Sequence, residues 1–363
     1  MPHSIVGQNI LVTGGAGFIG SHLVDALAER NSVLVVDDFS VGSMENLQRH
    51  RTANQVRIIE ADVRDTDKMK ELVRNVDIVY HLAVQCIRLS IGDPELVHEV
   101  NSTGTLSMLL ASRESGVKRF IYVSSSEVYG TAQEVPMNER HSLEPTTPYG
   151  ASKAAGELYT RSFYLTHGLP TIIVRPFNTY GPRAHFEGPY GEVIPRFVIR
   201  ALNDLPPVIF GDGEQTRDFT HVEDTVRGII LASECDQLIG DAINVGYGRE
   251  ISINELARIV LKELDKEYVQ PEYQAPRPGD VRRHYADTSK ASRLLGYAPR
   301  IDIEQGIELY LHWLREQRFD HRAALAQQQV RNWGGPPRDV VETERGGAVV
   351  KETKHPRAHT ACD

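Results

Sequence analysis

The stretch Asn9-Ile10-Leu11-Val12-Thr13-Gly14-Gly15-Ala16-Gly17-Phe18-Ile19-Gly20 decides the fold. Its first five residues read as a short buried strand, which runs directly into closely spaced glycines and then into a helical pattern over residues 21–30. Gly15, Gly17 and Gly20 fit the G-x-G-x-x-G spacing. Gly14, Gly17 and Gly20 also fit a looser pattern with one glycine at every third position. Because glycines lack side chains, a pyrophosphate can approach backbone N–H groups at the helix N-terminus. We therefore predict a dinucleotide site made by Gly14, Gly17, Phe18, Ile19 and Gly20.

A second apolar strand, residues 32–36, ends at Asp37 and Asp38. An acid at this distance from the glycines meets the ribose hydroxyls of a bound dinucleotide. A carboxylate would repel the 2′-phosphate of NADP, and no arginine stands immediately after Asp37, so the pattern favours NAD. The alternative is that both acids only end the strand and open a turn.

Two further strands, residues 56–60 and 76–81, also end where a cofactor would lie, because ligands bind at the carboxyl ends of parallel strands. We predict Asp62 at the adenine edge and Ala83 on the ribose, with Val63, Leu82 and Val84 as neighbouring cofactor contacts. His81 is interpreted as a structural histidine, since no second histidine, cysteine or acid stands at metal-ligand spacing. No metal site is predicted.

Composition narrows the class of protein. A chain of 363 residues with 40% apolar content can bury a large core, and its alternating strands and helices indicate an α/β fold. The net charge of −9 disfavours nucleic acid or an anionic membrane as a general partner. No apolar run reaches membrane-spanning length, and Cys86, Cys235 and Cys362 are too few and too far apart for a disulfide framework. We expect a soluble cytoplasmic protein.

Tyr149 and Lys153 stand four residues apart, so on a helix they share one face. An ammonium beside a phenol favours the phenolate, and a tyrosine otherwise keeps its proton to about pH 10. The pair could therefore remove a hydroxyl proton, although the same spacing is common on helix surfaces. The apolar strand from Phe120 ends in the hydroxyls of residues 124–126 and in Glu127, where an unpaired carboxylate would be costly unless it had a function.

Several motifs occur along the chain in an order that points to one protein family. They are residues 13–20, Leu82-Ala83, residues 124–130, residues 149–153, residues 175–182, Gly211-Asp212-Gly213, Arg217-Asp218-Phe219 and Arg277-Pro278-Gly279-Asp280. Together they resemble the extended short-chain dehydrogenase/reductase family, and more narrowly its nucleotide-sugar 4-epimerases and 4,6-dehydratases. The similarity runs from Asn9 to about Trp313. It implies a Rossmann-type doubly wound parallel sheet with a smaller, discontinuous C-terminal substrate lobe, NAD as cofactor, a nucleotide-diphosphate sugar as substrate, and a homodimer built on helices over residues 94–115 and 149–167.

The resemblance also implies residue roles. Tyr149 would be the base, Ser125 would hydrogen-bond the reacting sugar oxygen, and Lys153 would hold Tyr149 and the nicotinamide ribose. Asn101 and Pro176 would lie near the cofactor, and Ser126, Asn178, Arg217, Arg277 and Asp280 would bind the sugar, diphosphate and nucleoside. Two arginines suit a diphosphate because each offers a planar fork of charged donors.

Oxidation of the sugar at C4 is the shared first step, and the second step remains open. A 4-epimerase returns hydride to the other face of the 4-keto sugar. A 4,6-dehydratase needs a base at C5, a role open to Glu127, and many carry an Asp before that Glu where this chain has Ser126. We rank the 4-epimerase first and the dehydratase second. A uronate decarboxylase and a non-catalytic NAD-binding regulator are less favoured alternatives.

The expected domain plan follows the same motifs. Residues 1–176 form the NAD-binding domain, with sheet returns near 208–225 and 242–246, and residues 177–317 form mainly the sugar-nucleotide lobe. Residues 318–363 lose apolar periodicity and are predicted as a disordered tail, with Trp333 as a docking residue.

Overall fold

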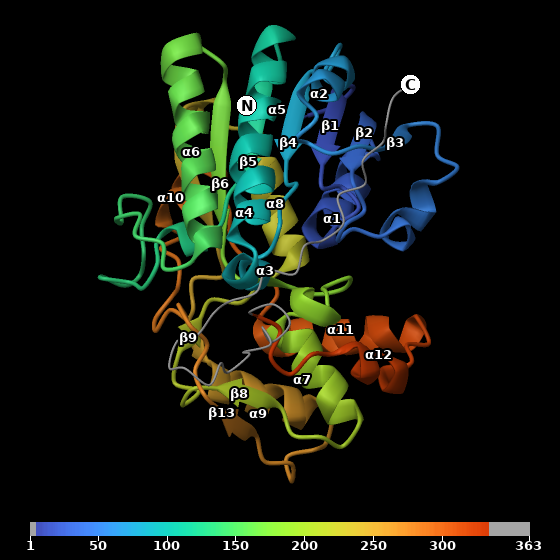
Figure 1. Cartoon of the computed structure of the whole chain (residues 1–363), viewed down its shortest axis with the longest axis vertical. Helices are drawn as coiled ribbons and strands as arrows, with labels where there is room; N and C mark the ends of the chain where they lie inside the picture. The colour runs from blue at the N-terminus through green and yellow to red at the C-terminus, as the bar shows by residue number, and fades with distance from the viewer. Residues whose placement is uncertain (1–4, 334–363) are drawn as a thin grey trace, which may run out of the picture.

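The computed structural model describes residues 5–333 and has a large α/β layer above a smaller lobe (Figure 1). The large layer is built on a seven-stranded sheet in the order β11-β6-β5-β4-β1-β2-β3, with every neighbouring pair parallel. The strands are β1 Asn9–Thr13, β2 Ser32–Asp37, β3 Val56–Glu60, β4 Ile78–His81, β5 Arg119–Val123, β6 Thr171–Pro176 and β11 Ala242–Val245. The predicted doubly wound sheet is confirmed. Its order reverses beside β1, which places a crevice between the ends of β1 and β4.

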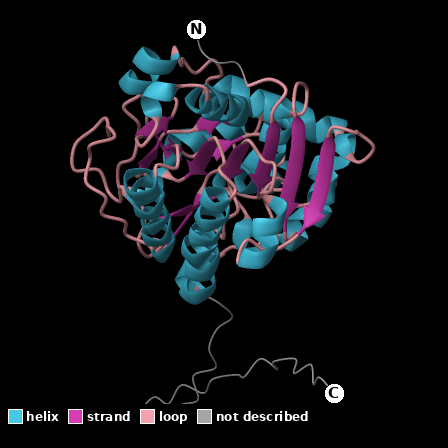
Figure 2. Cartoon of the chain, turned by 90° about the horizontal axis from the view of Figure 1, so that it is seen from above, coloured by secondary structure: helices cyan, strands magenta, loops and turns pink. Residues whose placement is uncertain are grey.

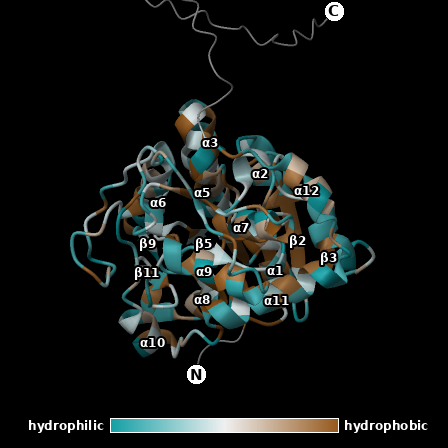
Figure 3. Ribbon diagram, turned by 90° about the horizontal axis from the view of Figure 1, so that it is seen from below, coloured by the Kyte–Doolittle hydropathy of each residue, from teal (hydrophilic) through white to brown (hydrophobic). Residues whose placement is uncertain are grey.

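Helices cover both faces of this sheet (Figure 2). Along β1 the side chains of Ile10 and Val12 enter one core, and Leu11 enters the other, because successive strand residues point to opposite faces. The first core is closed by α1 Phe18–Leu27 and α8 Val222–Ser233, and the second by α2 Thr66–Leu72, α5 Gly104–Glu114 and α6 Pro148–His167. Hydrophobic colouring gathers along the strands between these helices (Figure 3).

The predicted single helix over residues 94–115 is three consecutive pieces. Helix α4 Pro94–His98 passes into a π-helical turn, η2 Glu99–Thr103, and then into α5. A wider turn of this kind changes the direction of side chains within a helix, and such turns recur at functional sites. Asn101 lies inside it.

The lobe has its own apolar core, formed mainly by α7 Val193–Leu202, α9 Ile253–Glu263 and α11 Ile303–Glu316. Three two-stranded sheets border it: β7 Thr179–Tyr180 with β10 Thr220–His221, β9 Thr216–Arg217 with β12 Ile251–Ser252, and β8 Val208–Phe210 with β13 Glu272–Gln274. The predicted sheet return at 242–246 is present as β11. The predicted return to the large sheet near residues 208–225 is wrong, because the strands in this range pair only within the small sheets. Of this part of the chain, only the start of α8 packs on the large sheet.

The prediction of a disordered tail from residue 318 is wrong for the residues that the structure describes. Helix α12 His321–Gln327 packs beside α7, and the side chain of Asn332 is only 2% exposed. The remainder of the predicted tail, residues 334–363, lies outside the described residues. The sequence signal failed because this segment is held by a few separate contacts, such as Phe319 on the lobe core, Trp333 on Phe210 and the polar contacts of Asn332, and not by a periodic apolar stripe.

The remaining short elements are η1 Met44–His50, α3 Ile87–Gly92, η3 Ser126–Val128, η4 Gly188–Tyr190, η5 Asp236–Leu238 and α10 Ser289–Leu295. Among residues 5–333, no helix has the length and apolar character needed to cross a bilayer.

Candidate active site

A cavity of about 430 Å³ opens at the carboxyl ends of the sheet strands and extends into the lobe. Nearly all the residues predicted as functional line it: Gly14, Gly17, Phe18, Ile19, Gly20, Asp37, Asp38, Val63, Leu82, Ala83, Val84, Ser125, Ser126, Glu127, Tyr149, Lys153, Pro176, Asn178, Arg217, Arg277 and Asp280. Segments far apart in the chain therefore meet at one site.

The glycine loop is packed too closely for side chains. Gly14 has a φ of +67°, and a Cβ there would stand 2.7 Å from the backbone nitrogen of Ala83. A Cβ on Gly20 would collide with the carbonyl of Gly14. The loop thus leads into α1 with backbone atoms at its surface, as a pyrophosphate at a helix N-terminus requires. This arrangement fits a dinucleotide.

Asp37 ends β2 and is 6% exposed. Its two carboxylate oxygens accept hydrogen bonds from the backbone nitrogens of Ala16, at 2.8 Å, and Phe39, at 2.9 Å. Burial raises the pKa of this carboxyl, while those two hydrogen bonds act in the opposite direction. Asp37 therefore also fixes the glycine loop, a role beyond the ribose contact that the sequence predicts.

Two predicted cofactor residues do not line the cavity. The carboxylate of Asp62 is bound by the guanidinium of Arg64, with Nη2 at 2.7 Å from Oδ2, and its neighbour Val63 lines the cavity instead. Asn101, which is 1% exposed, lies behind the wall. Its amide donates to the Gln85 carbonyl at 3.1 Å and to Ser152 Oγ at 2.9 Å. Asn101 therefore joins the turn after β4 to the helix that carries Tyr149.

His81 takes part in a buried chain of hydrogen bonds. Thr105 Oγ1 donates to the Asn101 carbonyl at 2.6 Å, so it accepts from His81 Nε2 at 3.0 Å. His81 Nδ1 is then left to accept from Thr13 Oγ1 at 2.7 Å. Burial and, to a smaller extent, the charge of nearby Lys153 lower the pKa of the imidazole to about 3. His81 is the neutral structural histidine that the sequence predicts.

Tyr149 lies in the first turn of α6, whose N-terminus is capped by the Thr147 hydroxyl at 3.1 Å from the Gly150 nitrogen. The phenol lines the cavity together with Ser125 and Glu127. The surrounding protein raises its pKa by desolvation, and the Glu127 carboxylate acts in the same direction. A hydrogen bond with Ser125 has the opposite effect and stabilises the phenolate.

Lys153 is 3% exposed, and its Nζ donates to the Val123 carbonyl at 2.6 Å. The same nitrogen stands 4.5 Å from the ring centre of Tyr122. Burial lowers the pKa of Lys153 and the Glu157 carboxylate partly offsets this, which leaves a pKa of about 7. The sequence predicts a direct effect of Lys153 on the Tyr149 phenol. In this structure the ammonium faces a carbonyl and an aromatic ring.

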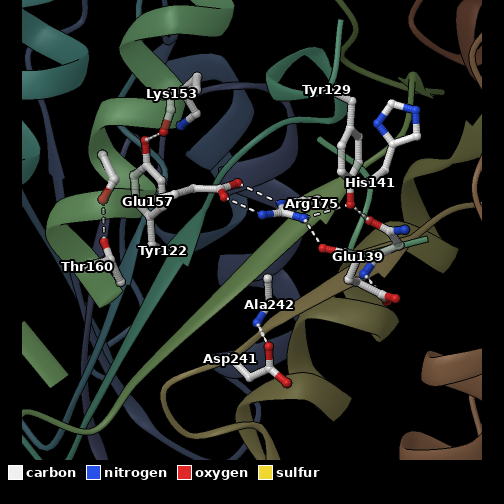
Figure 4. Close-up of polar contacts among 12 residues, drawn as sticks. Tyr122, Tyr129, Glu139, His141, Lys153, Glu157, Thr160, Arg175, Asp241 and Ala242 are labelled. Carbon is white, nitrogen blue, oxygen red and sulfur yellow. Dashed lines mark hydrogen bonds and ion pairs between the residues drawn. The ribbon is translucent and has the colours of Figure 1, made fainter. Parts of the chain in front are cut away.

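Glu157 is one helical turn beyond Lys153 and is bound bidentately by Arg175 on β6 (Figure 4). Arg175 Nε lies 2.9 Å from Oε1, and Nη2 lies 2.6 Å from Oε2. The Tyr129 hydroxyl accepts from Arg175 Nη1 at 2.7 Å and donates to Asn244 on β11 at 2.7 Å. This buried network joins α6 to the edge of the sheet, and the sequence motifs gave no separate role to Glu157.

Two arginines converge on one acid at the lobe side of the cavity. Arg217 and Arg277 each place Nη2 near Asp280 Oδ1, at 2.5 Å and 2.6 Å respectively. Arg217 also donates to the Val281 carbonyl at 2.8 Å, which fixes its orientation. The cluster presents two guanidinium groups to the cavity, as an anionic diphosphate requires.

Comparison with known proteins agrees with this geometry. Residues 11–310 match the family described as GDP-mannose 4,6 dehydratase. A putative UDP-glucose 4-epimerase of Methanocaldococcus jannaschii is 36% identical over 84% of this chain and 98% of its own length.

Two solved structures are also similar. A UDP-N-acetylglucosamine 4-epimerase from Methanobrevibacter ruminantium, in complex with UDP-N-acetylmuramic acid, is 36% identical with a TM-score of 0.81, over 86% of this chain and 100% of that one. A dTDP-glucose 4,6-dehydratase from Streptomyces venezuelae, with NAD bound, is 34% identical with a TM-score of 0.81, over 85% and 98%. The chain belongs to the extended short-chain dehydrogenase/reductase family, among the NAD-dependent nucleotide-sugar epimerases and dehydratases, which are enzymes.

Proposed function

We propose that this enzyme is an NAD-dependent nucleotide-sugar 4-epimerase. The observation that carries the proposal is one cavity lined by Ser125, Tyr149 and Lys153 at the sheet and by Arg217 and Arg277 at the lobe. NAD, when bound, would supply a reversible hydride acceptor for the sugar carbon. The glycine loop, Asp37 and Pro176 would hold this cofactor.

The side chains then have separate tasks. Tyr149 removes the proton of the C4 hydroxyl, and Ser125 hydrogen-bonds both the phenol and the sugar oxygen. The Lys153 ammonium is bound to the Val123 carbonyl in this structure, so a positive charge on it would favour the phenolate form of Tyr149 only through space. The arginines hold the diphosphate while the 4-keto sugar turns, so the sugar can present its other face without leaving the enzyme.

Epimerisation needs no further acid, and this favours it over dehydration. In a 4,6-dehydratase the C6 hydroxyl leaves as water and must be protonated. The residue before Glu127 is Ser126, which is 3% exposed and is a poor proton donor.

A 4,6-dehydratase is the second candidate, and Glu127 favours it. This carboxylate lines the same cavity and is close enough to Tyr149 to influence its pKa. A base at that position could remove the C5 proton of a 4-keto sugar.

The test is incubation of the purified enzyme with a panel of UDP-, dTDP- and GDP-sugars, followed by product analysis with NMR. We expect a C4 epimer, little change in its formation rate in Glu127→Gln, and a rate lower by about 10²–10⁴ in Tyr149→Phe. Tyr159→Phe, on an exposed part of the same helix, is the matched control. A stable 4-keto-6-deoxy product that disappears in Glu127→Gln would replace the epimerase proposal with the dehydratase.

We also propose a homodimer formed through α5 and α6. Leu158 and Leu165, seven residues apart on α6, share one helix face and are 64% and 66% exposed, and apolar side chains gathered on one exposed face mark interaction surfaces. Light scattering on the intact enzyme should give twice the chain mass, and a monomer at micromolar concentration would refute the dimer.

A further inference from the structure

A segment at the end of the described chain, residues 328–333, crosses the lobe side of the cavity; we call it the C-terminal strap. One side chain anchors it. Arg196 Nη2 donates to the carbonyls of Gln329, at 3.0 Å, and Val330, at 2.6 Å, and Arg196 Nη1 donates to Asn332 Oδ1 at 3.3 Å. Charge-assisted hydrogen bonds of this kind are stronger than neutral ones. The strap is therefore attached to α7.

The last two strap residues reach the cavity itself. Asn332 Nδ2 donates to the Gly191 carbonyl at 2.9 Å, which leaves its side chain only 2% exposed. The Trp333 ring meets the Phe210 ring edge-on, with centroids 4.5 Å apart. Asn332, Trp333 and Phe210 all line the same cavity as the catalytic tyrosine.

The strap lies beyond the residues that the family model matches, because that match ends at residue 310. The wall formed by Asn332 and Trp333 is therefore not part of the matched family pattern.

The chemistry of this wall suits a nucleobase. A base is a flat ring with hydrogen-bonding edges, and aromatic faces bind it by stacking. Phe210 and Trp333 line this part of the cavity with two perpendicular rings, and Gln215 adds an amide. The amide of Asn332 is already bound to Arg196 and to the Gly191 carbonyl, so it holds Trp333 in place. The neighbouring Arg217 and Arg277 suit the diphosphate that joins base to sugar.

We propose that Trp333, held in place by Asn332, forms part of the nucleobase pocket and helps to set affinity for the nucleoside part of the substrate. This inference rests on the proposed function, because it takes the cavity to bind a nucleotide sugar.

The two tryptophans of the sequence allow a direct test. Trp313 stacks on Tyr310 in the lobe core, so Trp313→Phe leaves Trp333 as the single fluorescent indole. We expect UDP, dTDP or GDP to change this fluorescence with saturation, and inorganic pyrophosphate to produce no comparable change. An equal response to pyrophosphate would show that the signal reports the diphosphate alone, and would overturn the proposal.

Affinity provides the second measurement. Trp333→Ala should weaken binding of the preferred nucleoside diphosphate by roughly tenfold, near the lower end of the range for base stacking on an aromatic ring. Its effect on the KM for the sugar nucleotide should exceed its effect on kcat. Tyr268→Ala is the matched control, because Tyr268 is 71% exposed on the same lobe and lies outside the cavity lining. Equal affinity in Trp333→Ala and Tyr268→Ala would refute the nucleobase role.

The two proposals can fail separately. Calorimetric titration with nucleoside diphosphates needs no turnover, so a tenfold loss in Trp333→Ala supports the pocket even if no sugar in the panel is epimerised. Conversely, an active epimerase with an unchanged KM in Trp333→Ala retains the proposed function and rejects the pocket.

Discussion

The charge on Lys153 depends on a few close neighbours. Burial favours the neutral amine, whereas the Val123 carbonyl, the Tyr122 ring and the Glu157 carboxylate favour the ammonium. The ion pair with Arg175 offsets the charge of Glu157 and so limits how far that carboxylate raises the pKa of Lys153. Lys153 therefore titrates close to neutral pH, where a small change in its surroundings alters its charge.

Replacing Glu157 with Gln should lower the pKa of Lys153 from about 7, because the carboxylate that favours the ammonium is removed. In a plot of kcat against pH, the loss of activity on the alkaline side should then begin at lower pH. We also expect unfolding to become easier by about 3–5 kcal/mol, since Arg175 is left as a buried unpaired charge. Nitrogen NMR of the Lys153 amine, assigned with Lys153→Met, reports the titration without turnover. An unchanged titration in Glu157→Gln would contradict this account.

The same pKa predicts a pH effect on stability. An unfolded lysine titrates at 10.5 and the folded Lys153 at about 7, so between these values the unfolded chain binds the extra proton. The contribution of Lys153 to the free energy of unfolding must therefore rise with pH over that window. It follows that Lys153→Met should lack this part of the slope in urea titrations at pH 7, 8 and 9.

At the scale of elements, hydrophobic periodicity correctly predicts the strands and helices that are defined by a buried apolar face. The strands at Asn9–Thr13, Val56–Glu60 and Ala242–Val245 are where their apolar runs place them, and α6 begins within one residue of its predicted start. The π-helical turn around Asn101 was missed, because one wider turn hardly disturbs an apolar pattern. Two-residue strands such as β9 were missed for a related reason, since so short a segment carries no period.

The glycine loop permits a controlled test of close packing. Gly14 and Gly116 both have a φ of +67°, but a Cβ on Gly14 would meet the Ala83 backbone at 2.7 Å, whereas nothing lies within 4 Å at Gly116. Gly116→Ala should cost about 1 kcal/mol of stability through backbone strain alone. Gly14→Ala should cost several kcal/mol more and should also abolish NAD binding in calorimetric titrations. Equal losses in the two variants would show that the contact is unimportant.

At the scale of the whole molecule, the candidate site was more predictable than the surfaces around it. Short motifs gave the residues from Gly14 to Asp280 that line the cavity, because each motif keeps its chemistry in a fixed local spacing. The placement of Asp62 depends on its ion pair with Arg64, and that of Trp333 depends on Arg196 and Phe210. Contacts of this kind join segments through space, and one-dimensional patterns do not record them.

Asp218 connects three distant segments. Its carboxylate is fully buried and accepts hydrogen bonds from the backbone nitrogens of Tyr247, Gly248 and Ala286, at 2.9, 2.9 and 3.1 Å. Asp218→Asn would turn an amide donor toward these donors, so we expect a loss of about 2–4 kcal/mol in urea unfolding. Asp212→Asn, at an exposed carboxylate in the same lobe, is the control and should change stability by less than about 1 kcal/mol. Similar losses in both variants would contradict a linking role for Asp218.

The edge strand β11 has a consequence for how the chain matures on the ribosome. It is made from residues 242–245, long after β6, which is its one sheet partner among residues 5–333. Until those residues emerge, the nascent chain exposes the free edge of β6, and unpaired edges invite aggregation. The large sheet of the cofactor-binding domain therefore cannot be completed until the ribosome has made much of the lobe, so we expect the two parts to complete folding together.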